Sequence, residues 1–212
     1  QEPYSDFTLS SVSSYLDAQV NDLWSSRLEV GHSENREESL DKLSDERGVF
    51  NTCRDSVNWL NTLALSDRHS LLLGGEWYED QLNSNTAFAE QQRWNQAAFV
   101  QHRYESEHFS TELGVRQDKN EQFGSENTWN AALSLDLAER LELLLSYGEG
   151  FHAPTFNDLY YPDYSNPDLK PEHSKSYELQ WRSQLAETTR LEASLYRTDI
   201  QDAIASDQNF IP

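Results

Sequence analysis

Hydrophobic and polar residues alternate along much of this chain with a period of two. Residues 140–148 follow the pattern with Leu144 as the one misfit, and residues 128–137 follow it throughout. Successive side chains of a β-strand point to opposite sides, so such a segment is a strand lying between two different media. In residues 128–137 the apolar odd positions are Trp129, Ala131, Leu133, Leu135 and Leu137.

About ten segments show this alternation, some with less clean faces. Most are near the roughly 9–11 residues that a tilted membrane strand needs. The pattern predicts an all-β chain, an antiparallel meander of about ten strands taken from a transmembrane β-barrel. The segments are residues 7–16, 20–32, 57–65, 70–77, 94–104, 108–116, 128–137, 140–148, 176–182 and 190–196.

The predicted connections alternate between short and long. Short turns at one rim and long loops at the other are typical of outer-membrane barrels, with periplasmic turns and extracellular loops. A soluble β-sandwich, the alternative fold, has no reason to keep this alternation. We expect short connections near 17–19, 66–68, 105–107, 138–139 and 186–188, and long ones near 33–56, 78–93, 117–127 and 152–173.

The two faces of the strands predict two environments. The polar face is expected to line a lumen and the apolar face to meet lipid. Trp77, Trp129 and Tyr147 lie on the apolar face near the long-loop ends of their strands, which favours an aromatic girdle at the membrane surface. The alternative is that they are core aromatics of a sandwich.

Composition excludes some functions. The chain carries 37 acidic and 16 basic residues, a net charge of −21, which excludes nucleic acid as an expected partner. Six Trp and ten Tyr argue against disorder. With Cys53 as its one cysteine, the chain can form no disulfide within itself, and this residue is expected to be an unpaired loop thiol.

No catalytic motif is apparent, so an enzyme is not expected, and the histidines lack metal-binding spacing. The acidic segment 34–55 has two readings: a solvated charged loop, or carboxylates that hold Ca²⁺ through its six to eight oxygen ligands. Its charged residues are Glu34, Glu37, Glu38, Asp41, Asp45, Glu46 and Asp55, with Arg36, Lys42, Arg47 and Arg54.

Two motifs resemble those of TonB-dependent receptors. Residues 146–154 read SYGEGFHAP, similar to a strand end and loop start of that family, although His152 stands where Arg or Lys is commoner. Residues 166–174 read NPDLKPEHS, similar to the family's Asn-Pro block. Pro167 and Pro171 restrict the backbone before the next strand, so this block is more simply scaffold than ligand site.

Within the family, the cobalamin (vitamin B12) receptors look nearest. Residues 156–160 read FNDLY and residues 114–124 read GVRQDKNEQFG, as in that subfamily. Ferric-siderophore and haem receptors share the Asn-Pro block and stay an alternative, as does a soluble extracellular β-domain for adhesion or glycan binding. The resemblance implies an outer-membrane transporter with a 22-stranded barrel, filled by a plug that contacts TonB.

On this resemblance, residues 1–212 are part of a barrel domain whose plug and last strands lie outside the chain. The implied partners are cobalamin or another large nutrient, outer-membrane lipid and lipopolysaccharide, and TonB through the plug. No cofactor is expected in this segment, with calcium a candidate for the intact receptor. Aromatic hydroxyl side chains suit a large amphipathic ligand, whereas the alternative is a self-packed surface loop. The ligand-binding candidates are Tyr160, Tyr161, Asp163 and Tyr164.

Overall fold

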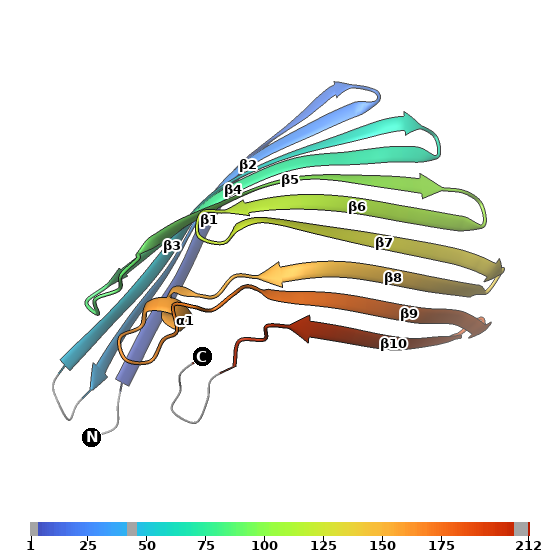
Figure 1. Ribbon diagram of the computed structural model, residues 1–212. Helices are drawn as coiled ribbons and strands as arrows, with labels where there is room; N and C mark the ends of the chain where they lie inside the picture. The colour runs from blue at the N-terminus through green and yellow to red at the C-terminus, as the bar shows by residue number, and fades with distance from the viewer. Residues whose placement is uncertain (1–3, 42–45, 206–211) are drawn as a thin grey trace.

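The computed structural model describes residues 4–41, 46–205 and 212, almost all of them in β-strands. Ten strands form one antiparallel sheet in which each strand pairs with the next along the chain, which confirms the predicted meander (Figure 1). The elements are β1 (Tyr4–Asn21), β2 (Trp24–Asp41), β3 (Glu46–Ser66), β4 (His69–Ser84), β5 (Gln92–Glu105), β6 (Phe109–Asn120), β7 (Gly124–Ala138), β8 (Leu141–His152), α1 (Phe156–Tyr160), β9 (Glu172–Ala186) and β10 (Thr189–Gln201).

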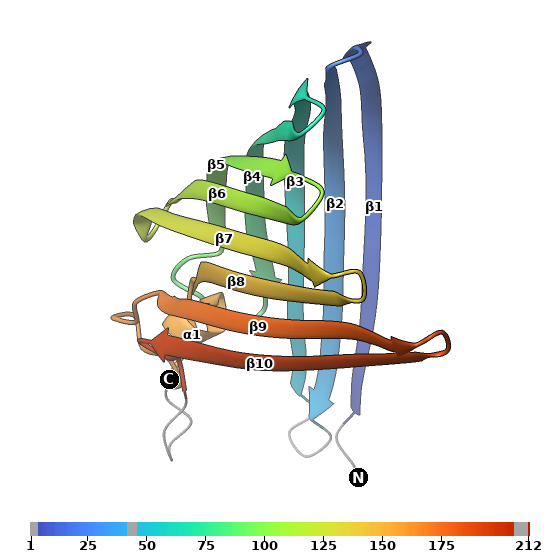
Figure 2. The same ribbon diagram turned by 90° about the vertical axis from the view of Figure 1, so that its right-hand side faces the viewer.

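The sheet bends into an open arc with β1 and β10 as its two edges (Figures 1 and 2). Helix α1 lies against the concave side of this arc, here called the inner face, and the opposite side is called the outer face. Within the described residues, no helix is long and apolar enough to cross a bilayer.

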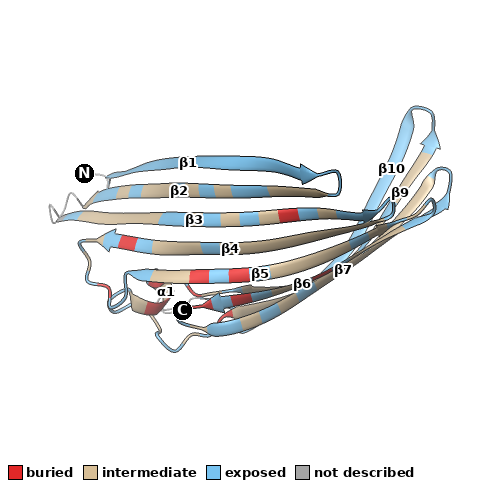
Figure 3. Ribbon diagram, turned by 90° about the horizontal axis from the view of Figure 1, so that it is seen from above, coloured by how far each residue is buried: buried red, intermediate tan, exposed pale blue. Residues whose placement is uncertain are grey.

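The outer face is apolar and uncovered. Leu145 of β8 pairs with Leu133 of β7 and with Leu179 of β9, and Leu179 pairs in turn with Leu195 of β10. Leu145 is 40% exposed and Leu195 is 73% exposed. Few residues of the sheet are buried (Figure 3), so these leucines have no second layer to pack against. A face of this kind suits hydrocarbon rather than water.

Aromatic side chains gather on the outer face near the long-loop ends of the strands. The rings of Trp129 and Tyr147 lie 4.3 Å apart between centroids, and Tyr147 lies 5.0 Å from Tyr177. Trp77 is 38% exposed on β4. All three residues predicted for a girdle therefore stand on the outer face at this rim, joined by Tyr177.

The prediction of a long loop at 33–56 is wrong. Strand β2 continues to Asp41 and β3 begins at Glu46, with Lys42 and Asp45 outside the described residues. Some of the charged residues pair across the strands, as Arg47 does with Glu38 at 3.5 Å, and Arg36 pairs with Glu34 within β2. Backbone pairing between strands does not require an apolar face, so the charges do not end these strands.

The predicted long loop at 117–127 is also wrong, because β6 and β7 are joined by residues 121–123 alone. The Asn120 side-chain oxygen accepts hydrogen bonds from the backbone N–H groups of Gln122 and Phe123, at 3.0 and 3.2 Å. Gly124 follows with φ 78°, a conformation that glycine adopts at little cost. A tight turn therefore replaces the loop.

The other connections agree better with their predictions. Long segments at 85–91 and 153–171 leave the sheet, and two- or three-residue turns follow β3, β5, β7 and β9. The first short turn is displaced: it was expected near 17–19, but β1 runs to Asn21 and the turn is Asp22–Leu23. There the Asn21 side-chain oxygen accepts from the Leu23 N–H at 2.9 Å.

Candidate functional site

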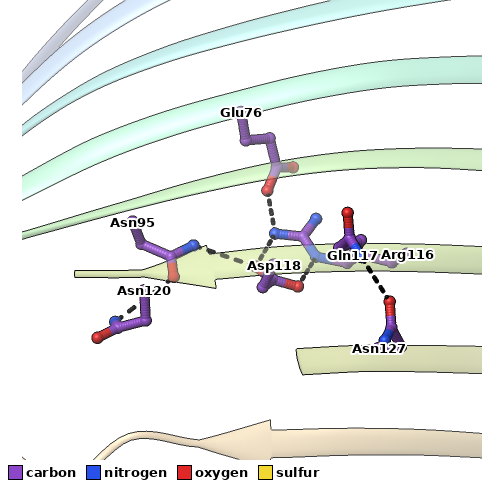
Figure 4. A network of polar contacts seen from close by, with 7 residues as sticks. All are labelled: Glu76, Asn95, Arg116, Gln117, Asp118, Asn120 and Asn127. Atoms are coloured by element: carbon purple, nitrogen blue, oxygen red, sulfur yellow. Dashed lines mark hydrogen bonds and ion pairs between the residues drawn. The ribbon is translucent and has the colours of Figure 1, made fainter. Parts of the chain in front are cut away.

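The inner face of β4–β6 carries a buried polar network (Figure 4). Arg116 binds Asp118 through Nε and Nη2, at 2.7 and 2.9 Å, and reaches Glu76 at 2.6 Å. Asn95 donates to Asp118 at 3.1 Å, and Asn120 donates to Asn95 at 3.5 Å. Asp118 is only 4% exposed, and burying a carboxylate is tolerated when it is paired and hydrogen-bonded. The network holds these side chains in one arrangement.

A second ion pair lies further toward the long-loop rim. Arg54 of β3 binds Asp80 of β4 in a forked contact, with Nε–Oδ1 at 2.6 Å and Nη2–Oδ2 at 2.8 Å. The Arg54 guanidinium also lies 4.1 Å from the ring centre of Tyr78. Forked pairs of this type fix both geometry and charge. Both of these regions of the inner wall therefore carry positive and negative groups together.

Helix α1 is stabilised at its start by side chains of its own segment. The Thr155 side chain accepts from the Asp158 N–H at 3.2 Å, and the Asp158 carboxylate accepts from the Thr155 N–H at 2.8 Å. This reciprocal arrangement is a capping box. The helix ends at Tyr160, and its C-cap Tyr161 has an extended backbone. One turn therefore places Phe156 and Leu159 on the same side, where they are 8% and 1% exposed.

The connection 153–171 is anchored to the inner face by Arg93 of β5. Arg93 Nη1 donates to the Pro154 carbonyl oxygen at 2.9 Å. Its guanidinium lies 5.2 Å from the ring centre of Phe156 and 5.7 Å from that of Phe123, within the range of cation–π attraction. A single arginine therefore links the connection, β5 and the β6–β7 turn.

Apolar contacts complete the anchor. Phe156 packs with Leu82 of β4 and Phe88 of the 85–91 connection in a buried cluster, with Phe50 and Tyr160 packed against it. This cluster is formed between two connections and the strand ends, not beneath the middle of the sheet. It gives the long-loop rim its own small core.

The predicted ligand residues separate into different environments. Tyr160 is part of this packing, and its hydroxyl accepts from Gln122 Nε2 at 2.6 Å. Tyr161 and Tyr164 are 40% and 53% exposed, with ring centres 6.3 Å apart. Asp163 turns the chain between them with φ 68°, a conformation that Asp adopts more readily than most residues.

Below this rim lies an open hollow of about 1030 Å³ on the inner face. None of the four predicted residues lines it. Sequence reasoning assigned the polar face to a lumen but singled out no residue on it, and the assumed loop at 33–56 concealed Arg54. Pairing the strands in register would have brought Arg54 and Asp80 together. The lining includes Arg54, Asp80, Arg93, Arg116, His152 and Phe156.

Two solved structures share the fold of this chain. A variant of the ferric enterobactin receptor PfeA from Pseudomonas aeruginosa, in complex with enterobactin, aligns with TM-score 0.82 at 18% identity, over 93% of this chain and 35% of that one. The copper transporter OprC aligns with TM-score 0.77 at 12% identity, over 99% of this chain and 42% of that one.

Sequence comparisons give closer relatives. The protein named vitamin B12 transporter BtuB from Photobacterium profundum is 38% identical over 160 residues, 75% of this chain and 26% of that protein. Its namesake from Vibrio vulnificus is 35% identical over 191 residues, 86% of this chain and 30% of that protein. The chain thus spans less than a third of these relatives. The family model described as TonB dependent receptor-like, beta-barrel, matches residues 2–212, and the chain belongs to this family of TonB-dependent receptor β-barrels.

Proposed function

We propose that the full-length protein is an outer-membrane transporter that binds cobalamin and imports it with energy relayed by TonB. The observation that carries the ligand assignment is the 38% and 35% identity to two proteins named vitamin B12 transporters. The two-faced wall supports the transport role, because an apolar outer face suits lipid and a polar inner face suits a hydrated lumen. A plug inside the barrel and contact with TonB are part of this proposal.

The proposed ligand contacts are Tyr161 and Tyr164, with Tyr160 and Asp163 holding them in place. Exposed aromatic rings on a braced loop offer broad apolar area at small entropic cost. They stand on the anchored connection 153–171, whose residues Ala153, Thr155 and Phe156 line the inner hollow. Calcium binding by the loops of the intact receptor stays a prediction of the family resemblance.

Titration calorimetry with cyanocobalamin tests this proposal on the full-length protein in detergent. We expect a single saturable site, weakened about tenfold in the Tyr161→Ala, Tyr164→Ala double variant, since aromatic contacts dominate such sites. Tyr196→Ala, an exposed tyrosine of β10, is the matched control and should bind as the unsubstituted protein does. Absence of cobalamin binding would contradict the ligand assignment.

A ferric siderophore is the second candidate ligand, because an enterobactin-bound receptor shares the fold at TM-score 0.82. The same titration with ferric enterobactin separates the two. If the protein bound the iron complex tightly and did not bind cobalamin, the ligand assigned to it would be a ferric siderophore. Its proposed role as a transporter would be unchanged. Haem, tested likewise, is the remaining ligand that the family resemblance suggested.

A further inference from the structure

The outer face carries a notch of about 430 Å³ across β3–β6. Gly75 of β4 lines the notch, and it pairs with Trp59 of β3 on one side and with Ala98 of β5 on the other. Trp77, two residues further along the same face, lines the notch together with Trp59. Trp59 is 52% exposed and Trp77 is 38% exposed. Two small residues thus lie beside two large aromatic ones, with no side chain filling the space.

Gly75 is not required by the backbone. A Cβ atom built on it would approach nothing nearer than the Ala97 carbonyl oxygen, at 3.8 Å, and the residue does not have the left-handed φ that favours glycine. Its neighbour Gly74 differs, because a Cβ there would collide with the Phe99 ring on the inner face. The consequence of glycine at position 75 is therefore the open space itself.

The end of the notch toward the long-loop rim is polar and includes a lysine. Lys119 of β6 pairs with Gln96 of β5 and with Ser125 of β7, and all three line the notch. Within the described residues, Lys119 takes part in no ion pair. This is notable in a chain whose net charge is −21.

Lys119 stands at the level expected for a lipid headgroup. Val115 is the last apolar residue of the outer face on β6, and Lys119 follows four positions later, roughly 13 Å along the strand. A lysine at this height reaches the interface while its stem covers apolar surface. The notch therefore has apolar surface at Gly75 and Ala98, beside the tryptophan rings, and a cation at Lys119 toward the rim. This is the order in which a lipid presents its acyl chain and its phosphate.

We propose that the notch binds one anionic lipid of the membrane leaflet at the long-loop rim. An acyl chain lies over Gly75 and Ala98 between the two tryptophans, and the lipid phosphate meets the Lys119 ammonium with Gln96 and Ser125 as further donors. A lipid fits better than a protein partner because the notch is continuous with the apolar outer face. The inference rests on the outer-membrane placement of the proposed function and extends it to a specific site.

Native mass spectrometry of the full-length protein in a neutral detergent tests the site. The probes are dipalmitoyl phosphatidylglycerol, dipalmitoyl phosphatidylcholine with the same chains, and inorganic phosphate without a chain. We expect one phosphatidylglycerol to bind in preference to phosphatidylcholine, and inorganic phosphate not to compete. Lys119→Gln should weaken phosphatidylglycerol about fivefold, the contribution of one interfacial lysine, and Gly75→Leu should weaken both lipids.

Two matched controls accompany these variants. Lys175→Gln removes a lysine from β9, outside the notch, and Gly148→Leu adds the same side chain where a Cβ meets nothing within 4 Å. Both should keep the lipid affinity of the unsubstituted protein. Equal binding of the two lipids with no effect of Lys119→Gln would overturn the proposal, as would competition by inorganic phosphate alone.

Cobalamin titration of the same variants separates this inference from the proposed function. Both notch variants should retain the unsubstituted cobalamin affinity, because the notch and the loop tyrosines lie on opposite faces of the wall. If the protein selected the anionic lipid but bound no cobalamin, the cobalamin assignment would be contradicted and the lipid site would stand. Cobalamin binding without lipid selectivity would sink the notch alone.

Discussion

Two polar regions at the long-loop rim follow different courses. Strands β2 and β3 carry the charged segment outward as paired strands, up to Asp41 and from Glu46. The connection 153–171 instead leaves the wall and folds onto the inner face, where Leu159 is 1% exposed. Both regions are rich in polar residues. The difference lies in the apolar residues spaced by three in α1, which can be buried only by turning inward.

The two regions are also held by interactions of different strength. The outward strand β3 has cross-strand ion pairs, such as that of Arg54 with Asp80 of β4, in which the arginine side chain is 49% exposed. Exposed pairs contribute about 0–1 kcal/mol each. The inward connection has buried Phe156 and Leu159 and an arginine bound to a carbonyl. Single substitutions should therefore disturb the connection far more than the strands.

The largest effect is expected from Leu159→Ala. Removing a fully buried leucine costs about 2–5 kcal/mol, so helix α1 should open locally while the sheet stays intact. Hydrogen exchange of residues 155–161 in the full-length protein measures this as faster amide exchange. Tyr164→Ala, which truncates a side chain that is 53% exposed, should leave exchange there nearly unchanged. Equal effects of the two variants would refute inward anchoring.

Arg93→Met should have the next largest effect. The substitution removes the hydrogen bond to the Pro154 carbonyl, and hydrogen bonds to charged groups contribute about 1.5–3 kcal/mol. Amide exchange in residues 155–159 should rise at least about tenfold. Arg93→Lys keeps the charge without the planar fork and should give an intermediate rise. If β5 itself exchanged faster and α1 did not, the anchor would lie elsewhere.

The sheet was predictable from the sequence because its cause is local. Alternation in residues 128–137 and 140–148 is imposed by the two media on either side of the sheet. It can be read from each strand alone, without knowing which strands pair. The ends of the strands were harder to predict. Charged residues follow Val30 and precede Val57. They mark the end of the apolar band and not the end of the strands, because β2 runs on to Asp41 and β3 begins at Glu46.

The candidate site was less predictable, since it depends on pairing between distant segments. Arg116 and Asp118 are neighbours in sequence, but Glu76 joins them only through the register of β4, β5 and β6. The tight turn at 121–123 depends on one asparagine side chain, a contact that composition does not reveal. The loop tyrosines are predicted as ligand contacts from their place in a long connection and from their side-chain chemistry, and neither of these reveals their burial.

A smaller effect is expected from Arg54→Met in the outward strands. The forked contact with Asp80 is lost, but both strands keep their backbone ladder, so the cost should be about 0.2–1 kcal/mol. Exchange in residues 50–56 and 78–84 measures this directly, and high salt should reduce the difference further. A cost equal to that of Leu159→Ala would show that ion pairs, not backbone pairing, hold these strands outward.

The smallest expected effect is on the reactivity of Cys53, which lies beyond the apolar band of β3. Labelling of this thiol shows on which side of the membrane the outward strands end. Partial burial raises the pKa of its thiol, and the nearby carboxylates of Asp55, Glu34, Asp80 and Glu79 raise it further. Since the thiolate is the reactive form, alkylation by iodoacetamide at pH 7.5, roughly a unit below the free-cysteine pKa, should be slower than for free cysteine.

Asp55→Asn removes the first of those negative charges, so the pKa of Cys53 should fall and its alkylation at the same pH should speed up. Glu178→Gln, a carboxylate of distant β9, is the control and should change nothing. A membrane-impermeant maleimide should reach Cys53 from outside intact cells, because β3 carries it past the lipid-facing band. Labelling only after the cells are broken would mean that the charged ends of β2 and β3 point into the periplasm, and the assignment of the two rims would have to be reversed.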